Sequence, residues 1–335
     1  MLKDYPNLVG IWSFNNPYTQ IKGKGKVVKR NSWQYFYYLA RAKYFINNVN
    51  WPTEYEKRKG SVEVQTLHGT FLKTMGLDVE AEVNTPQKLE GFRKRHKRWD
   101  YLVSPSQFMT EISKRVFEFE GEMLEYGFPR NDVLVNSSVE KSASQQSIRE
   151  YLNIPKDKKI ILYAPTYRNK SGFNFELDIA KMHEKLSDEY VLLIRLHYFV
   201  SRNLDLSNFG DFVVNVCNYP DVQELLLVTD VLITDYSSIM FDYANLKKPM
   251  MFFTYDLEYY RDVLRGMYLD FEKEAPGKLC STTEELIESL GNLSSYEQRY
   301  QKKLMEFSNK FNQLETGQAS SQILKKIIRE SEKRK

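Results

Sequence analysis

The chain has 335 residues, a length at which about two domains are expected. Hydrophobic residues make up 42% and charged residues 27%, a balance that excludes a disordered chain, a collagen and a coiled coil. The formal net charge of +4 is too small to indicate a nucleic acid as partner.

The cysteines and the apolar runs indicate in which cellular compartment the protein is expected. Cys217 and Cys280 are the two cysteines, and neither belongs to a CxxC pair. A disulfide framework or a zinc site is therefore not expected, and a reducing compartment fits. No apolar run approaches the roughly 18 residues that cross a bilayer, and the first residues show no signal-peptide pattern. We expect a cytoplasmic protein, at most peripheral on the inner face of the cell membrane.

Apolar runs typical of strands alternate with helical patterns along the whole chain, which predicts an α/β architecture. In the first half, strands are expected at 8–14, 62–67 and 101–103, and helices at 33–46 and 110–126. In the second half, five bare apolar runs are typical of buried parallel strands. They lie at 160–163, 191–196, 212–216, 231–234 and 250–253, with helices expected at 179–186, 222–228, 239–246, 284–290, 296–311 and 318–328.

A polar stretch without periodicity, 136–146, is predicted to be a linker. We therefore expect an N-terminal domain over 1–137, a C-terminal domain over 147–312, and a closing helix within 313–335. Two such α/β domains bind ligands at the carboxyl ends of their strands, facing an interdomain cleft.

Two of the four histidines follow predicted strands. His68 comes after the strand at 62–67, and His197 ends the strand at 191–196. A lone histidine at a strand end is more often a satisfied polar residue, but two at equivalent positions facing one cleft favour an acid–base or phosphate-binding role. His96, in a basic run, and His183, within a helix, are expected to be surface residues.

A second group of polar residues follows the strand at 231–234. Ser237 and Ser238 are placed to cap the next helix, whose free N–H groups attract anions. A plain helix cap is the simpler alternative. Asp242 lies one helical turn further on, where its carboxylate can accept hydrogen bonds from a polyol or a ribose.

Three further segments place loop residues or arginines at the carboxyl ends of the predicted strands. Pro165 and Thr166 follow the strand at 160–163, Arg195 precedes His197, and Arg130 lies in a turn near the predicted linker. Together with the helix start, these cations can surround a diphosphate. No GxGxxG or GxxxxGK[ST] sequence occurs, which disfavours a dinucleotide or Walker-type site.

A basic run with large apolar residues, KLEGFRKRHKRW, begins at Lys88. This mixture indicates either a surface helix lying on anionic lipid or a solvated basic face. The two alternatives are about equally supported by the sequence.

The motifs also resemble a known family. TLHGTFLK at 66–73, GFPRND at 127–132, LYAPTYR at 162–168, RLH at 195–197 and ITDYSSIMFDY at 233–243 come in the order of the CDP-glycerol glycerophosphotransferases, which build wall teichoic acids and related capsular polymers. The resemblance implies a GT-B-like fold, two Rossmann-like domains facing a central cleft. Family members usually have one more strand and helix before the position at which Met1 stands in this chain. The first domain is therefore expected to lack these two elements, or the chain is expected to be a fragment.

The resemblance also implies roles for individual residues. His68 and His197 would be the catalytic histidines, with His68 taking the acceptor proton and His197 holding the pyrophosphate together with Arg130 and Arg195. The remaining substrate-binding residues would be Gly69, Thr70, Pro165, Thr166, Ser237, Ser238 and Asp242. Neither a metal nor a cofactor is expected.

The implied reaction transfers glycerol phosphate, or ribitol phosphate, from its CDP-activated form to a hydroxyl of a lipid-linked acceptor and releases CMP. The expected partners are CDP-glycerol or CDP-ribitol, a polyprenyl-diphosphate-linked saccharide or polyol-phosphate acceptor, and an anionic membrane surface. Two alternatives remain open at this point. One is a GT-B glycosyltransferase that uses a nucleotide sugar, and the other is a non-catalytic module that binds the polymer or the CDP-polyol.

Overall fold

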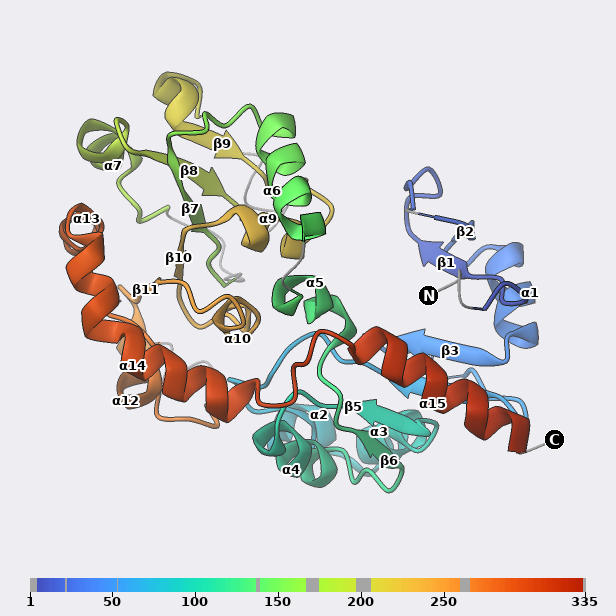
Figure 1. The fold of residues 1–335 in the computed structure, drawn as a ribbon. Helices are drawn as coiled ribbons and strands as arrows, with labels where there is room; N and C mark the ends of the chain where they lie inside the picture. Colours follow the sequence, from blue (N-terminus) through green and yellow to red (C-terminus); the bar gives the residue numbers. More distant parts are fainter. Residues whose placement is uncertain are drawn as a thin grey trace.

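The structure is a computed structural model that describes residues 5–21, 23–52, 54–136, 139–166, 175–196, 206–259 and 266–333. Three sheets organise this part of the chain, and the paired strands within each of them run parallel. Figure 1 shows the largest sheet in one half of the molecule and the other two sheets in the other half. The predicted α/β class is confirmed.

The largest sheet has six strands in the order β12-β11-β10-β7-β8-β9. The order reverses between β7 and β10, and open parallel sheets bind ligands outside the carboxyl ends of the strands at such a point. The strands are β7 (Lys159–Tyr163), β8 (Tyr190–Ile194), β9 (Val213–Asn215), β10 (Val231–Thr234), β11 (Met250–Phe253) and β12 (Leu279–Cys280).

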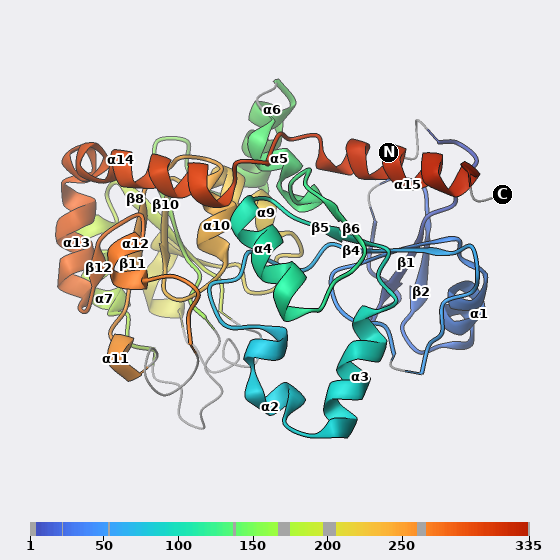
Figure 2. The same cartoon turned by 90° about the horizontal axis from the view of Figure 1, so that it is seen from below.

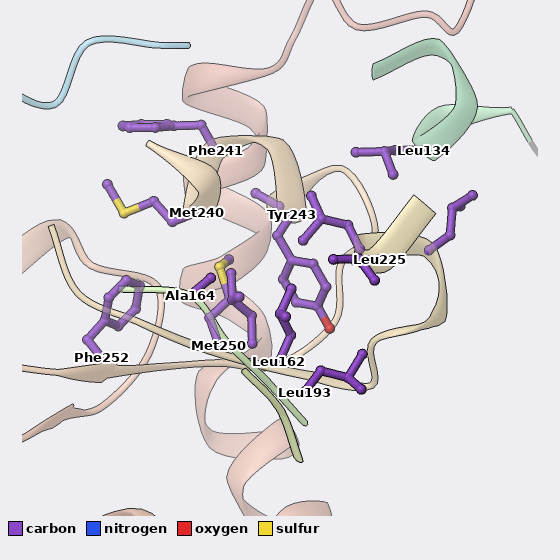
Figure 3. Packing of buried hydrophobic residues seen from close by; sticks show 14 of the residues in the cluster. Leu134, Leu162, Ala164, Leu193, Leu225, Met240, Phe241, Tyr243, Met250 and Phe252 are labelled. Carbon is purple, nitrogen blue, oxygen red and sulfur yellow. The ribbon is translucent and has the colours of Figure 1, made fainter. Parts of the chain in front are cut away.

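Helices cover both faces of this sheet because successive strand residues point to opposite sides. Ile160 and Leu162 of β7 belong to one core, whereas Ile161 and Tyr163 belong to the other. Figure 3 shows the first of these cores, in which Tyr243 and Leu225 lie near Leu162 of the sheet. The first core involves α6 (Val139–Tyr151), α9 (Val222–Val228), α10 (Ile239–Ala244) and α14 (Leu293–Phe311), and the second α7 (Ile179–Leu186) and α13 (Thr283–Gly291).

A four-stranded sheet, in the order β3-β4-β5-β6, carries the second large core. The last helix, α15 (Ala319–Lys333), returns to this sheet and buries Ile323 and Ile327 in its core (Figures 1 and 2). The other elements are β3 (Tyr44–Asn47), β4 (Val62–Gln65), β5 (Tyr101–Val103), β6 (Glu122–Leu124), α3 (Pro86–His96) and α4 (Gln107–Val116).

A smaller unit precedes the four-stranded sheet. The parallel pair β1 (Ile11–Phe14) and β2 (Lys26–Lys29) and the helix α1 (Trp33–Arg41) share a core of four buried side chains, Val28, Tyr35, Leu39 and Phe45. Short elements complete the described chain: η1 (Gly76–Asp78), α2 (Glu80–Val83), η2 (Pro129–Asn131), α5 (Asp132–Val135), η3 (Ser207–Phe212), α11 (Leu257–Tyr259) and α12 (Phe271–Glu274).

Two predicted helices are wrong in their second halves. The helix expected at 33–46 ends at Arg41, and Tyr44 begins strand β3. The helix expected at 110–126 ends at Val116, and β6 follows it. Strands of three or four residues leave too short an apolar run to be separated from a neighbouring helix by periodicity.

The predicted linker at 136–146 is also wrong, because most of it forms α6. The helix packs on α9: Ile148 is buried in the shared core, and the Gln145 side chain donates a hydrogen bond to the Leu227 carbonyl. The contacts of these few residues with α9 stabilise a helix in this segment, although its polar composition without periodicity predicts a linker.

His96 is buried rather than exposed, which corrects the prediction that it is a surface residue. Only 6% of it is exposed, and its ring packs against Phe92, Trp99 and Phe117. Burial lowers the pKa of His96 to about 4. Phe92 and Trp99 are buried with it, whereas Leu89 is partly exposed, so the two large aromatic side chains of this basic run face the core and are not available to contact lipid.

Candidate functional site

The His68 loop follows β4 and has an unusual backbone. Leu67 has a φ of 53°, which is costly for a residue with a side chain, and its N–H donates to Gln65 Oε1 at 2.9 Å. His68 is exposed, with Nδ1 3.3 Å from the Asn48 carbonyl oxygen, whereas Gly69 is buried. A histidine that uses Nδ1–H for a carbonyl keeps Nε2 as an acceptor for a substrate proton.

Gly69 brings three predicted segments together. A Cβ atom on Gly69 would lie 2.7 Å from Ser238 Oγ and 4.0 Å from the Arg130 guanidinium. A side chain at position 69 would therefore force Ser238 to shift, so glycine favours this approach of the His68 loop to the loop after β10. His68 is therefore adjacent in the chain to the point where Ser238 and Arg130 meet it.

The loops after β7 and β10 are joined at the point where the strand order reverses. The Thr166 N–H donates to Asp235 Oδ1 at 2.7 Å, and the Thr234 hydroxyl donates to the Ala164 carbonyl at 2.7 Å. Both Asp235 and Thr234 are buried. Pro165 and Thr166 are thus held beside the segment that carries Ser237 and Ser238.

The capping prediction holds only in part. Ser237 Oγ accepts a long hydrogen bond, 3.4 Å, from the Ile239 N–H, and Ser238 makes no side-chain cap. The Ser238 hydroxyl lies instead against Gly69. The Ser238 hydroxyl therefore faces the His68 loop rather than the first turn of α10.

The Asp242 carboxylate accepts hydrogen bonds from three side chains of the protein. Arg130 donates to both of its oxygens, at 3.0 and 2.9 Å, Asn131 Nδ2 donates at 3.0 Å, and Gln223 Nε2 lies at 3.4 Å. Asp242 is only 7% exposed. This bidentate pair fixes the plane of the guanidinium, so Asp242 positions Arg130, a role that the sequence did not indicate.

Two participants were not predicted, Asn131 and Glu315. Asn131 Nδ2 also donates to Glu315 Oε1 at 2.8 Å, and the Phe128 N–H donates to the same carboxylate at 3.1 and 3.2 Å. At Gly127, with a φ of 85°, a Cβ atom would lie 2.5 Å from Glu315 Oε2. The segment before α15 is therefore bound to the turn that carries Arg130.

Asp132 strengthens this attachment. Its carboxylate accepts from the N–H groups of Ala319 and Ser320, at 2.8 and 2.9 Å, at the start of α15. An acidic side chain at a helix start satisfies donors that the helix leaves free. Nothing local in the sequence indicates this attachment, because Asp132 binds N–H groups 187 and 188 positions away and Glu315 binds Asn131 across 184 positions.

Burial raises the pKa of Glu315 to about 7 against an ordinary 4.5, and nearby Asp242 raises it further, while Asn131, the Phe128 amide and Arg130 oppose the shift. Because the fold favours the neutral acid, Glu315 contributes stability below pH 4.5 that is lost as the pH rises through about 7.

Glu315→Gln should remove this loss. Relative to wild type, the variant should gain up to about 3 kcal/mol in unfolding free energy between pH 5 and pH 8, measured by urea denaturation. The new amide can donate to Asn131 Oδ1, which is buried and has no partner among the described atoms. Glu297→Gln, at an exposed position of α14, is the control and should show no such gain. An equal gain in unfolding free energy for both variants would contradict the claim that burial makes the charged form of Glu315 costly.

Of the two predicted phosphate ligands Arg195 and His197, the structure describes only Arg195. Arg195 is half-buried, and its guanidinium donates to the carbonyls of Val216 and Tyr219 at 3.1 and 2.8 Å. Burial lowers the pKa of Arg195. It thus holds the loop after β9. His197, together with Tyr167 and Arg168, lies outside the described residues.

Two features are absent from the described ranges. No group of three or more His, Cys, Asp or Glu side chains in them is arranged to hold a metal ion. No helix in them has both the length and the apolarity needed to cross a membrane.

Comparison with known sequences places these residues in one family. The profile for CDP-Glycerol:Poly(glycerophosphate) glycerophosphotransferase matches residues 1–329. The teichoic acid poly(glycerol phosphate) polymerase of Staphylococcus epidermidis is 40% identical over 96% of this chain, and that of Bacillus subtilis is 41% identical over 98%. The chain spans about half the length of these two relatives, 46% of each. The teichoic acid glycerol-phosphate transferase of Staphylococcus aureus is 38% identical over 95% of this chain and 85% of its own length.

Solved structures agree with the sequence matches. The wall teichoic acid polymerase TagF aligns with a TM-score of 0.93 and 39% identity, over all of this chain and 84% of that chain. A TagF variant soaked with CDPG aligns equally well, with a TM-score of 0.93. The predicted GT-B-like fold is therefore confirmed. On the match over residues 1–329 and these relatives, the chain belongs to the CDP-glycerol:poly(glycerophosphate) glycerophosphotransferase family.

Proposed function

We propose that this chain transfers glycerol phosphate from CDP-glycerol to a hydroxyl group of a growing or priming acceptor in teichoic acid synthesis, releasing CMP. The observation that carries the proposal is the meeting of Gly69, Ser238 and Arg130 beside an exposed histidine. A base, a fixed guanidinium and a hydroxyl at one point are suited to a diphosphate whose charge increases as it is cleaved.

The proposed chemistry uses groups of the chain alone. The acceptor hydroxyl gives its proton to His68 Nε2, and its oxygen attacks the phosphorus that carries glycerol. The bond from that phosphorus to the bridging oxygen breaks, and CMP leaves with the electron pair. Arg130, oriented by Asp242, would neutralise the charge that accumulates on CMP. Pro165 and Thr166 would line the cytidine pocket, with Thr70, Ser237 and Ser238 on the phosphate and polyol and Arg195 and His197 on the pyrophosphate.

Glycerol is favoured over ribitol as the polyol. The poly(glycerol phosphate) polymerases and the glycerol-phosphate transferase are 38–41% identical over nearly the whole chain, whereas the glycerol-phosphate primases and the ribitol-phosphate polymerases are 30–33% identical. We expect CMP release from CDP-glycerol to exceed that from CDP-ribitol at least about tenfold in kcat/KM. The assay supplies each donor with a glycerol-phosphate-primed lipid acceptor. Equal rates would overturn the donor assignment, and binding of CDP-glycerol without turnover would indicate a non-catalytic module.

The acceptor would be a polyprenyl-diphosphate-linked saccharide or a polyol-phosphate chain of a teichoic acid or capsular polymer. Such an acceptor is held in the membrane by its lipid. The protein would therefore work as a peripheral protein at the anionic inner face of the cell membrane, where the acceptor hydroxyl comes within reach of His68.

A further inference from the structure

One buried side chain, Gln65, is hydrogen-bonded to both segments that adjoin the exposed His68. Gln65 is the last residue of β4, and only 2% of it is exposed. Its Oε1 accepts the Leu67 N–H at 2.9 Å, and its Nε2 donates to the Val49 carbonyl at 2.9 Å. A single amide group therefore joins the residue before His68 to the turn that follows β3.

This turn supplies a hydrogen-bond partner for the imidazole. His68 Nδ1 lies 3.3 Å from the Asn48 carbonyl oxygen, and Val49 is the next residue. Within the turn, the Val49 N–H donates to Asn47 Oδ1 at 3.3 Å, and the Asn47 carbonyl accepts the Thr66 N–H at 2.8 Å. Asn48 and Val49 are exposed, so hydrogen bonds rather than burial fix the direction of the Asn48 carbonyl.

The second hydrogen bond of Gln65 holds a strained backbone. Leu67 has a φ of 53°, and a residue with a side chain keeps such a conformation only where its surroundings hold it. Gln65 Oε1 does so by accepting the Leu67 N–H. Because His68 follows Leu67 directly, the backbone of Leu67 sets the direction in which the imidazole leaves the strand.

We infer that Gln65 is a positioning residue for His68: it holds the ring against the Asn48 carbonyl, with the proton on Nδ1 and the lone pair of Nε2 free for the acceptor hydroxyl. The inference rests on the proposed function, in which His68 Nε2 takes the acceptor proton. A neutral imidazole carries its proton on one nitrogen, and the hydrogen bond of that nitrogen decides which one. A proton on Nε2 would leave the site without its base.

The first test is the tautomer of His68 in the free wild-type chain. The nitrogen NMR shifts of its ring report the tautomer at a pH where the imidazole is neutral. The chain has four histidines, and the signals of His68 are those that disappear in His68→Ala. We expect the proton on Nδ1. A proton on Nε2 in the wild type overturns the inference without the need for any further variant.

The second test is Gln65→Met, which keeps the length of the side chain and removes both hydrogen bonds. The His68 ring should then populate both tautomers, and kcat for CMP release should fall at least about tenfold because the base is no longer held in one orientation. The KM for CDP-glycerol should stay within about twofold of the wild-type value. Calorimetric titration of CDP-glycerol counts the competent sites, so unfolded protein cannot account for a lower kcat.

Gln145→Met is the matched control. Gln145, on α6, donates from Nε2 to the Leu227 carbonyl at 2.6 Å, so this change removes the same kind of hydrogen bond outside the His68 loop. The variant should keep wild-type turnover and the Nδ1–H tautomer of His68. An equal change of tautomer in both variants would overturn the inference, because the loss of any such bond would then suffice.

The tautomer and the turnover separate this inference from the proposed function. If Gln65→Met keeps both, the positioning role is overturned and the proposed transfer stands. Loss of turnover with an unchanged tautomer also overturns the positioning role. A changed tautomer with normal turnover removes His68 as the base, and the inference with it. Wild type without turnover counts against the transfer, whereas the tautomers of wild type and Gln65→Met still decide whether Gln65 positions the ring.

Discussion

Replacing His68 with alanine should lower the turnover of CDP-glycerol by about 10²–10⁴-fold, the usual contribution of a general base, and leave donor binding nearly unchanged. His68 is exposed beside the Gly69–Ser238 contact, and its Nδ1 faces the Asn48 carbonyl, which leaves Nε2 for the acceptor proton. CMP release at saturating donor measures the first quantity, and calorimetric titration of CDP-glycerol the second.

The matched control for this variant is His183→Ala. His183 is half-buried on α7, where its ring lies 5.4 Å from Phe212, and it belongs to none of the segments that meet at Gly69. Its variant should keep wild-type turnover once its fold is confirmed by thermal unfolding. Unchanged turnover of the His68 variant would remove the base assignment, and a parallel loss of binding would make His68 a donor ligand instead.

Replacing Asp242 with alanine should have the largest effect on stability, about 3 kcal/mol of unfolding free energy. The change leaves the Arg130 guanidinium without its bidentate partner in a site where its side chain is 24% exposed, and breaking such a pair costs more than the pair contributes. The variant should also lose turnover, because Arg130 is no longer held in one orientation. Urea denaturation and CMP release measure the two effects.

An exposed pair of the same geometry provides the control. Arg93 donates two hydrogen bonds to Glu118, at 2.6 and 2.7 Å, with side chains 54% and 41% exposed. Glu118→Ala should cost less than about 1 kcal/mol, since exposed ion pairs contribute little. Equal losses at Glu118 and Asp242 would mean that burial adds nothing to the Arg130 pair, and normal turnover of the Asp242 variant would contradict its positioning role.

The six-stranded sheet could be predicted well for a physical reason. Strands covered on both faces are apolar at every position, so β7, β8, β10 and β11 are visible as uninterrupted runs. The loops that follow such strands gather at one edge of a parallel sheet. This places Thr166 and Ser238 near each other without any knowledge of the three-dimensional structure.

The four-stranded sheet and the partners within the site could not be predicted in the same way. β3 and β6 are only four and three residues long, and each begins a few residues after a helix that hides its period. Asp242 pairs with Arg130 across 112 positions, and Glu315 with Asn131 across 184. No local pattern encodes such separations. Likewise, the burial of His96 depends on Phe117, which approaches it only after folding.

The most direct test of the account is a crystal structure of His68→Ala with CDP-glycerol bound. The account predicts the pyrophosphate beside Arg130 and Ser238, the cytidine against Pro165 and Thr166, and the glycerol toward the position of the removed imidazole. Donor bound in another place would contradict it, for instance in the open hollow of α6 and α9 that Ser147 and Tyr219 line.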